Sequence, residues 1–162
     1  MSEIRQTARV PVLLIVHHTP SPATQELLEA ALSGARDPGA NDGSVEVVVR
    51  PALTAGVVDA LNADGYLLAT PANIGYISGA LKHFFDTIYY PCLEATRGRH
   101  YAAVVHGNLD AGGALRALEA ITTGLRWSAV APVVTVTGSP SRDDLTAVHD
   151  AAATLAATLG TA

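Results

Sequence analysis

Hydroxyl groups and backbone amides gather where a phosphate could bind, in the loop that follows the first apolar run of the chain. Thr19, Ser21 and Thr24 supply three hydroxyls within six residues, directly before and within the first turn of an expected helix. The first amides of a helix lack intrahelical partners and the helix dipole is positive there, so an anion binds favourably. The same residues are equally typical of a capped helix with a polar turn, and both interpretations stay open. The loop contains no glycine and no lysine, so it is neither a Walker loop nor a dinucleotide fingerprint.

A second loop is suited to a flat, uncharged ligand. The segment 70–78 follows the apolar run 65–69 and precedes a helix with apolar residues at helical spacing. It contains no Asp, Glu, Lys, Arg, Cys or His, so it offers no acid or base for catalysis. A third loop, 106–113, holds three glycines, which let a backbone approach a flat ligand closely. Taken alone, this third loop is more typical of a flexible turn.

Five apolar runs are expected to form strands, and helices with one apolar face follow most of them. The predicted strands are 12–16, 45–49, 65–69, 101–105 and 132–136. The predicted helices are 23–35, a short one at 57–61, 78–90, one through 115–125, and one that begins at the capping sequence 141–144. The helix 78–90 should end before Pro91, because the residue preceding a proline avoids helical geometry.

This alternation predicts an α/β fold of three layers, a doubly wound five-stranded parallel sheet with helices on both faces. Right-handed crossovers leave few topologies, and the strand order 2-1-3-4-5 is the leading one. In that order the carboxyl ends of the first, third and fourth strands converge, as they do where open α/β sheets bind ligands. The loops 17–25, 70–78 and 106–113 are therefore expected to form one site.

Composition places the chain among globular proteins. Its 162 residues fit a single domain, 1–162, and 49% hydrophobic with 15% charged residues excludes a disordered chain. The net charge of −5 argues against nucleic-acid binding, which needs a basic face. No apolar run approaches the roughly 18 residues of a membrane span, so no membrane partner is expected. Cys92 is the only cysteine, which excludes an internal disulfide and fits a cytoplasmic protein.

The middle segment resembles one known family. The residues that carry the resemblance are Thr70-Pro71, Gly75, Ile77-Ser78-Gly79, Leu81-Lys82, Phe84 and Asp86. In this order and spacing they look like the third-strand loop and helix of flavodoxin-like FMN proteins, and most like the branch of quinone reductases and NAD(P)H-dependent FMN reductases. The first loop is similar to the Ser/Thr-rich phosphate loop of this family. The glycine-rich third loop resembles the one that borders the isoalloxazine ring.

The resemblance implies a set of FMN contacts in this chain. The phosphate would be held by Thr19, Ser21, Ala23, Thr24 and Gln25. The ribityl chain and one edge of the ring would meet Pro71, Ala72, Asn73, Ile74 and Gly75. The pyrimidine side would be bordered by Gly107, Asn108, Asp110 and Gly113. Two positions depart from the family pattern, since Ala23 replaces a usual asparagine and Asn73 a frequent aromatic residue. Ring stacking would then fall to Tyr76 or to a neighbouring subunit.

The resemblance also implies a redox function in which the flavin supplies the chemistry and no catalytic side chain is assigned. A reductase would pass hydride from NAD(P)H through FMN to a quinone or another small acceptor. The alternative is a flavodoxin-type electron carrier, or a flavin-binding protein, without NAD(P)H turnover. Such carriers are usually strongly acidic around the ring, whereas this chain has a net charge of only −5 and carries Lys82, Arg97 and Arg99. The charge therefore favours the reductase, and a relative that has lost flavin binding is the third possibility.

Two further expectations concern metals and partners. His17 and His18 are adjacent in a strand continuation and point to opposite faces, so no metal site is predicted. Either histidine meeting His106 at the edge of the sheet is the weaker alternative. The helix 78–90 carries four aromatic residues, Phe84, Phe85, Tyr89 and Tyr90, which is more than one sheet face needs. This surplus predicts a homodimer interface near the site.

Overall fold

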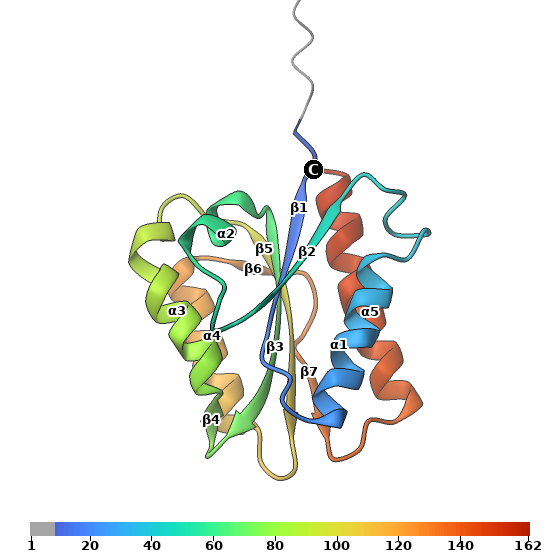
Figure 1. Ribbon diagram of the computed structural model, residues 1–162, viewed down its shortest axis with the longest axis vertical. Helices are drawn as coiled ribbons and strands as arrows, with labels where there is room; N and C mark the ends of the chain where they lie inside the picture. Colours follow the sequence, from blue (N-terminus) through green and yellow to red (C-terminus); the bar gives the residue numbers. More distant parts are fainter. Residues whose placement is uncertain (1–8) are drawn as a thin grey trace, which may run out of the picture.

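The computed structural model describes residues 9–162, which form a sheet between two layers of helices (Figure 1). The strands are β1 (Val12–His17), β2 (Glu46–Pro51), β3 (Gly65–Asn73), β4 (Tyr76–Ile77), β5 (His100–Gly107), β6 (Ser128–Ala129) and β7 (Val134–Thr137). The helices are α1 (Pro22–Ala35), α2 (Val57–Asn62), α3 (Gly79–Cys92), α4 (Gly112–Leu125) and α5 (Arg142–Gly160). Helices α1 and α5 cover one face of the sheet, and α2, α3 and α4 lie on the other. None of these helices is both long and apolar enough to span a membrane.

The strands of the main sheet are parallel and follow the order β2-β1-β3-β5-β6, while β7 pairs with β5 beyond the end of β6. The predicted order 2-1-3-4-5 is confirmed, with the fifth position shared by two short strands. The central strands are covered on both faces, which explains why their apolar residues are consecutive. In β1, Leu13 and Ile15 pack against α1 and α5, whereas Leu14 and Val16 belong to the core beneath α3 and α4.

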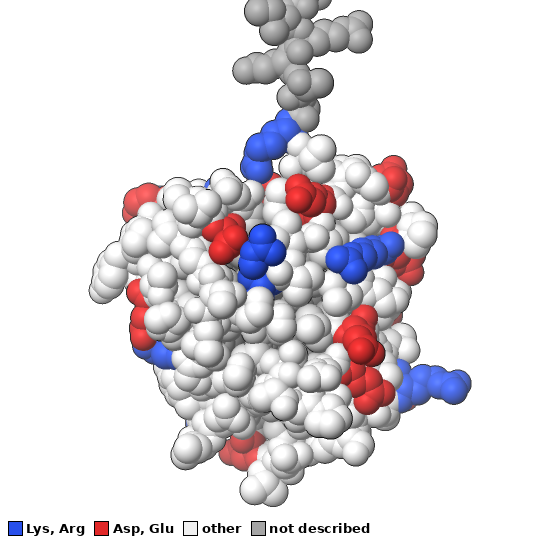
Figure 2. Space-filling model, in the orientation of Figure 1, with Lys and Arg blue, Asp and Glu red and all other residues white. Residues whose placement is uncertain are grey.

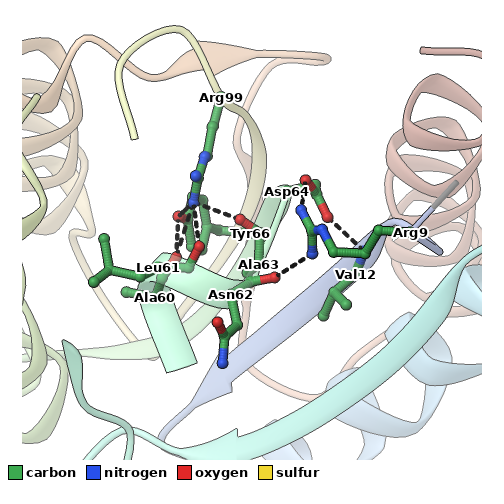
Figure 3. Close-up of polar contacts among 9 residues, drawn as sticks. All are labelled: Arg9, Val12, Ala60, Leu61, Asn62, Ala63, Asp64, Tyr66 and Arg99. Atoms are coloured by element: carbon green, nitrogen blue, oxygen red, sulfur yellow. Dashed lines mark hydrogen bonds and ion pairs between the residues drawn. The ribbon is translucent and has the colours of Figure 1, made fainter. Parts of the chain in front are cut away.

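A polar cluster fastens the short helix α2 to the amino end of the sheet (Figure 3). The Nη1 atom of Arg99 lies 2.6 Å from the carbonyl oxygen of Ala63 and 3.1 Å from that of Ala60, so the guanidinium caps this helix end. The Tyr66 hydroxyl donates to the same Ala60 carbonyl at 2.6 Å. Burial raises the pKa of Tyr66 to about 12, although the neighbouring Arg99 acts in the opposite direction. A helix of six residues is unstable alone, so these bonds hold it in place.

Two boundaries differ from those expected. Helix α3 continues through Pro91 to Cys92, so the prediction that it ends before Pro91 was wrong. Pro91 lies in the last turn, where its missing N–H removes only one helical hydrogen bond. The strand expected at 65–69 continues to Asn73 and folds back as β4, so the segment 70–78 is largely paired rather than an open loop.

Candidate functional site

The three predicted loops meet at one edge of the sheet, at the lower end of Figure 1. They follow β1, β3 and β5, three adjacent strands whose carboxyl ends all lie at this edge. The amide of His18 donates to the carbonyl of Ala69 at 2.9 Å, and Pro71 lies opposite His106 in the register of β3 and β5. Figure 2 shows that few charged side chains cover the lowest part of the molecule in this view. The topology thus produces the kind of edge at which open α/β sheets bind ligands.

The second loop is a tight β-hairpin with a strained tip. Ala72 pairs with Ile77 and Asn73 with Tyr76, which leaves Ile74 and Gly75 as a two-residue turn. Both turn residues have positive φ, 49° for Ile74 and 73° for Gly75, as a type I′ turn requires. A β-branched residue in this region is strained by about 1–2 kcal/mol, and the side chain of Ile74 is nevertheless fully exposed. Strain and apolar exposure at one residue are typical of a functional site.

Two buried hydroxyls fix the base of this hairpin to helix α3. Thr70 Oγ1 accepts the amide of Ser78 at 3.2 Å and lies 3.0 Å from its Oγ, and Ser78 Oγ accepts the amide of Leu81 at 3.2 Å as the N-cap of α3. Both side chains are buried. Thr70 and Ser78 of the middle segment therefore position the hairpin.

The third loop abuts the hairpin. A Cβ atom on Gly113 would lie 1.7 Å from the carbonyl oxygen of Gly75, so a side chain here would force the two loops apart. Asp110 Oδ1 accepts the amide of Gly112 at 2.8 Å and so satisfies one free amide at the start of α4. Leu109, at the outer part of the loop, is 89% exposed. Gly113 thus serves as a point of close contact, and the loop presents an apolar side chain to solvent.

A pocket of about 450 Å³ lies between the hairpin and the third loop. It is lined by Ala72, Ile74, Gly75, Gly107, Asn108, Leu109, Asp110, Gly113 and Arg116. Seven of these are among the predicted site residues, whereas Pro71 and Asn73 lie in β3 outside the lining. Leu109 and Arg116 were not predicted. The only signal for Leu109 was an apolar residue in a polar, glycine-rich loop. Arg116 lies in α4, beyond the predicted loop, and its guanidinium reaches back to Gly112, its i−4 neighbour, at the pocket.

The first loop is a capped helix start. Ser21 and Thr24 form a reciprocal capping box, with the amide of Thr24 donating to Ser21 Oγ at 3.2 Å and that of Ser21 to Thr24 Oγ1 at 3.0 Å. Thr24 is 3% exposed, so its hydroxyl serves this cap. The capped-helix interpretation is therefore confirmed, while a phosphate contact of the predicted residues stays a prediction. Ala23 and Gln25 lie in the first turn, and Gln25 is exposed.

The histidines at this edge are separately bonded. His17 Nδ1 lies 3.0 Å from Thr19 Oγ1, and burial, followed by the charge of His18, lowers the pKa of His17. His106 Nε2 lies 2.8 Å from the carbonyl oxygen of Gly138; because a carbonyl only accepts, Nε2 must hold the proton. Strand β3 lies between the strands of His17 and His106. Within residues 9–162, no three His, Cys, Asp or Glu side chains are grouped so that they could hold a metal ion.

A second hollow of about 410 Å³ lies on the sheet face over β1 and β2, away from this edge. Its floor is apolar, with Val12, Leu14 and Val48, and Arg9 and Arg50 stand at its rim. It exists because the short α2 leaves this part of the sheet uncovered. None of the predicted site residues lines it, so the edge pocket is the better candidate for the functional site.

Comparison with known proteins identifies the architecture. No family model and no curated protein matches this chain. A flavodoxin from the domain Archaea matches with a TM-score of 0.76 at 16% identity, over 91% of this chain and 98% of its own. A flavodoxin of Streptococcus pneumoniae TIGR4 matches with a TM-score of 0.74 at 21% identity, over 91% of this chain and 99% of its own. An NADH:FMN oxidoreductase in its apo form matches with a TM-score of 0.73 at 19% identity, over 92% of this chain and 90% of its own.

These matches extend over nearly the whole chain, and at such identities they bear on the fold alone. The sheet order and the layering described above agree with them. The chain therefore has the flavodoxin-like α/β fold.

Proposed function

We propose that this chain binds FMN at the carboxyl edge of its sheet and passes electrons from NAD(P)H through it to a quinone or another small acceptor. The observation that supports this most is the pocket between the β3–β4 hairpin and the β5–α4 loop. Its volume of about 450 Å³ lies within the range of roughly 300–1,000 Å³ that small-molecule sites occupy.

The pocket walls suit a flat aromatic ring. Ile74 and Leu109 stand on the two facing loops, and both expose large apolar side chains that a ring would cover. Each 100 Å² or so of apolar surface covered in this way stabilises binding by about 2.5 kcal/mol. Ala72 and Gly107 are small, so the backbone of both loops is accessible to the ligand. The residues present therefore fit the ring of a flavin.

The phosphate would bind at the β1–α1 loop in this proposal. Within residues 9–162, the amides of Thr19 and Ala23 have no hydrogen-bond partner, and the hydroxyls of Thr19 and Ser21 belong to the same turn. The loop has no lysine or arginine, and Pro20 and Pro22 have no amide proton. The loop can accept a phosphate, but with fewer donors than a loop rich in free amides.

Bound FMN would supply the two-electron chemistry, and the protein would position the ring and limit its access to water. Ile74 and Leu109 would shield the two sides of the ring, and the third loop would border one edge. No side chain is needed as an acid or base for hydride transfer from a nicotinamide. This agrees with the second loop, which contains no ionisable side chain other than Tyr76.

The proposal is tested on purified apoprotein. FMN added to the protein should bind saturably, with a change in flavin fluorescence, and the loaded protein should consume NADH or NADPH when a quinone is present. Gly113→Ala should weaken FMN binding, because its Cβ would collide with Gly75. Gly56→Ala is the matched control, since nothing lies within 4 Å of its Cβ. A protein that takes up no FMN would overturn the proposal.

A flavodoxin-type electron carrier is the second candidate. It is favoured by the whole-chain likeness to two flavodoxins, whose TM-scores of 0.76 and 0.74 are no lower than the 0.73 of the oxidoreductase. The two candidates share the FMN site and differ in turnover. FMN binding without any consumption of NAD(P)H, with several quinones tried, would leave the carrier as the function.

A further inference from the structure

Strand β2 leaves one side of the sheet bare. It is the end strand of the order β2-β1-β3-β5-β6, on the side of the sheet that faces the viewer in Figure 1. Among residues 9–162, no segment pairs with its outer side. Bare strands of this kind are usually protected by lysine, by proline or by a bulge. β2 has no lysine, and its one proline, Pro51, is its last residue.

The backbone groups that face outward belong to Val47 and Val49. The amide of Glu46 donates to the carbonyl of Pro11 at 2.9 Å, on the side of β1. Alternate residues of a parallel strand bond to the same neighbour, so the amides of Val47 and Val49 point away from β1. The carbonyl of Val49 accepts Arg50 Nη1 at 3.0 Å, a contact made at the exposed surface.

The free stretch is short and ends sharply on both sides. At one end, Asn41 Oδ1 accepts the amide of Val45 at 3.1 Å, and Asn41 Nδ2 donates to the carbonyl of Val45 at 2.9 Å. At the other end, Pro51 has no amide proton, and its carbonyl accepts amides of the following turn. An added strand would therefore bond to Val47 and Val49, which restricts its register.

One face of β2 carries opposite charges on either side of an apolar centre. Glu46, Val48 and Arg50 all line the hollow of about 410 Å³ on this sheet face. Glu46 and Arg50 are exposed, and Val48 is half-buried. Glu46 forms no ion pair within residues 9–162, and Arg50 Nε lies 3.6 Å from Asp59 Oδ1 in a partly exposed contact that is worth little. An antiparallel strand centred on Val48 would match β2 if it carried the same two charges at the same spacing.

We propose that β2 pairs with the β2 strand of a second copy of the chain, antiparallel and about a two-fold axis at Val48. Val47 then lies opposite Val49 of the second copy, and the two residues exchange both N–H···O bonds. Glu46 lies opposite Arg50 of the second copy, and the axis repeats each contact on its other side. A two-fold interface needs a self-complementary surface, and β2 is self-complementary in hydrogen bonds, in charge and in the apolar contact of Val48 with its own copy.

The joined sheet keeps both candidate sites open. Because the two β2 strands run antiparallel, the carboxyl edges of the two sheets lie at opposite ends of the pair. The contact is separate from the outer face of α3, on which a homodimer interface is predicted, and it does not depend on FMN. One strand from each chain makes a small interface, so we expect it to form well above micromolar concentration.

Disulfide trapping tests the register. In Val48→Cys the two introduced thiols would face each other with Cβ atoms about 4.5 Å apart, which a disulfide can bridge. Oxidation with copper phenanthroline, at protein concentrations well above micromolar, should give a covalent dimer on a non-reducing gel. The native Cys92 is fully buried and should not react.

The matched control lies on the same strand and face. In Glu46→Cys the two thiols would be about 13 Å apart, so this variant should stay unlinked. Arg50→Cys should stay unlinked for the same reason. An equal mixture of these two variants should form the mixed dimer, because positions 46 and 50 lie opposite each other. Both positions are exposed, so this mixture tests the register even if Val48→Cys folds poorly.

Charge exchange in the Val48→Cys protein tests the ion pairs. Adding Glu46→Arg or Arg50→Glu sets like charges opposite each other on both sides of the axis and should slow crosslinking about tenfold. Mixing the two variants should restore the rate, because each acid then faces a base. Glu119→Arg makes the same change of charge at an exposed position of α4 and should leave the rate unchanged.

Three outcomes would overturn the pairing. The first is a folded Val48→Cys that forms no covalent dimer. The second is Glu46→Cys crosslinking as fast as Val48→Cys, which would indicate random collision. The third is a mixture of the two charge variants that crosslinks no faster than either alone. None of these outcomes bears on the proposed FMN function, which is tested separately.

Discussion

Ile74 is the residue at which the protein departs furthest from ordinary backbone preference. Its φ of 49° suits Asn or Gly, and Asn-Gly is the preferred pair for a type I′ turn. Ile74→Asn should therefore raise the free energy of unfolding of the apoprotein by about 1 kcal/mol. It should also weaken FMN binding, because an apolar wall of the pocket is lost. Urea unfolding and fluorescence titration measure the two effects.

Leu109 provides the control for that variant. Like Ile74, it presents an exposed apolar side chain to the pocket, but its backbone has no positive φ. Leu109→Asn should weaken FMN binding without stabilising the apoprotein. Equal FMN affinity in both variants and the wild type would show that these side chains do not cover the ring.

The site residues that the sequence missed have physical reasons for being missed. Arg116 lies one helical turn beyond Gly112, outside the segment 106–113 that was expected to form the third loop, so it was not considered as a site residue. The strain at Ile74 was invisible because a type I′ turn is normally recognised by Asn or Asp at that place. The hydroxyls of the first loop were found, and those of Ser21 and Thr24 form the cap of α1, while a phosphate contact of this loop stays a prediction.

At the scale of elements, we expect two variants of the β1–α1 turn to separate helix capping from the proposed phosphate binding. Ser21→Ala removes the cap of α1 and should cost about 1 kcal/mol of folding free energy. Thr19→Ala leaves the capping box intact and should weaken FMN binding with little effect on riboflavin, which lacks the phosphate. Titrations with both flavins measure this. If Thr19→Ala weakens the two equally, or neither, the phosphate does not bind at this turn.

The anchor of α2 predicts a pH dependence of stability at the other end of the sheet. Tyr66 has a pKa of about 12 when folded and about 10 when unfolded, so its neutral form is favoured by folding. The stabilisation is fully present below pH 10 and is lost as the pH rises from 10 to 12. By linkage the loss is about 1.4 kcal/mol at pH 11. Tyr66→Phe should remove this part of the pH dependence, as urea unfolding at pH 9 and pH 11 can show. An unchanged slope in Tyr66→Phe would contradict it.

Element boundaries show what the sequence can and cannot predict. The buried central strands and the amphipathic helices follow from hydrophobic periodicity, so the layers and the strand order were predictable. The hairpin was not, because Pro71 and Asn73 are typical of loops and pair only through the tertiary arrangement. Pro91 is likewise typical of a helix end, yet α3 includes it in its last turn.

At the scale of the whole molecule, the cluster that anchors α2 and the candidate site lie at opposite edges of one sheet. The Arg99 and Tyr66 cluster lies at the amino edge, and the three loops lie at the carboxyl edge (Figures 1 and 3). Arg99→Met should lower the free energy of unfolding by about 1 kcal/mol, because the part-buried carbonyl of Ala63 at the end of α2 loses the guanidinium as its donor, while the Ala60 carbonyl keeps the Tyr66 hydroxyl. Its FMN affinity, measured well below the unfolding transition, should equal that of the wild type. Weaker FMN binding in the folded variant would show that the two edges are coupled.

The outer face of α3 is where we propose that two copies of the chain meet. Tyr90 is 82% exposed and stacks edge-on against Tyr89 at 5.2 Å, beside a hollow of about 210 Å³ that Phe85 and Ile121 also line. Because Tyr90 contributes little to the folded monomer, Tyr90→Glu should change the free energy of unfolding by at most about 0.5 kcal/mol. In sedimentation at micromolar concentration, the wild type should be a dimer and Tyr90→Glu a monomer of 16.7 kDa.

Glu94→Gln, at an exposed position beyond the end of α3, is the control and should stay dimeric. A wild-type protein that sediments only as a monomer would contradict this interface, and the ring would then have to be covered by Ile74, Leu109 and Tyr76 of one chain.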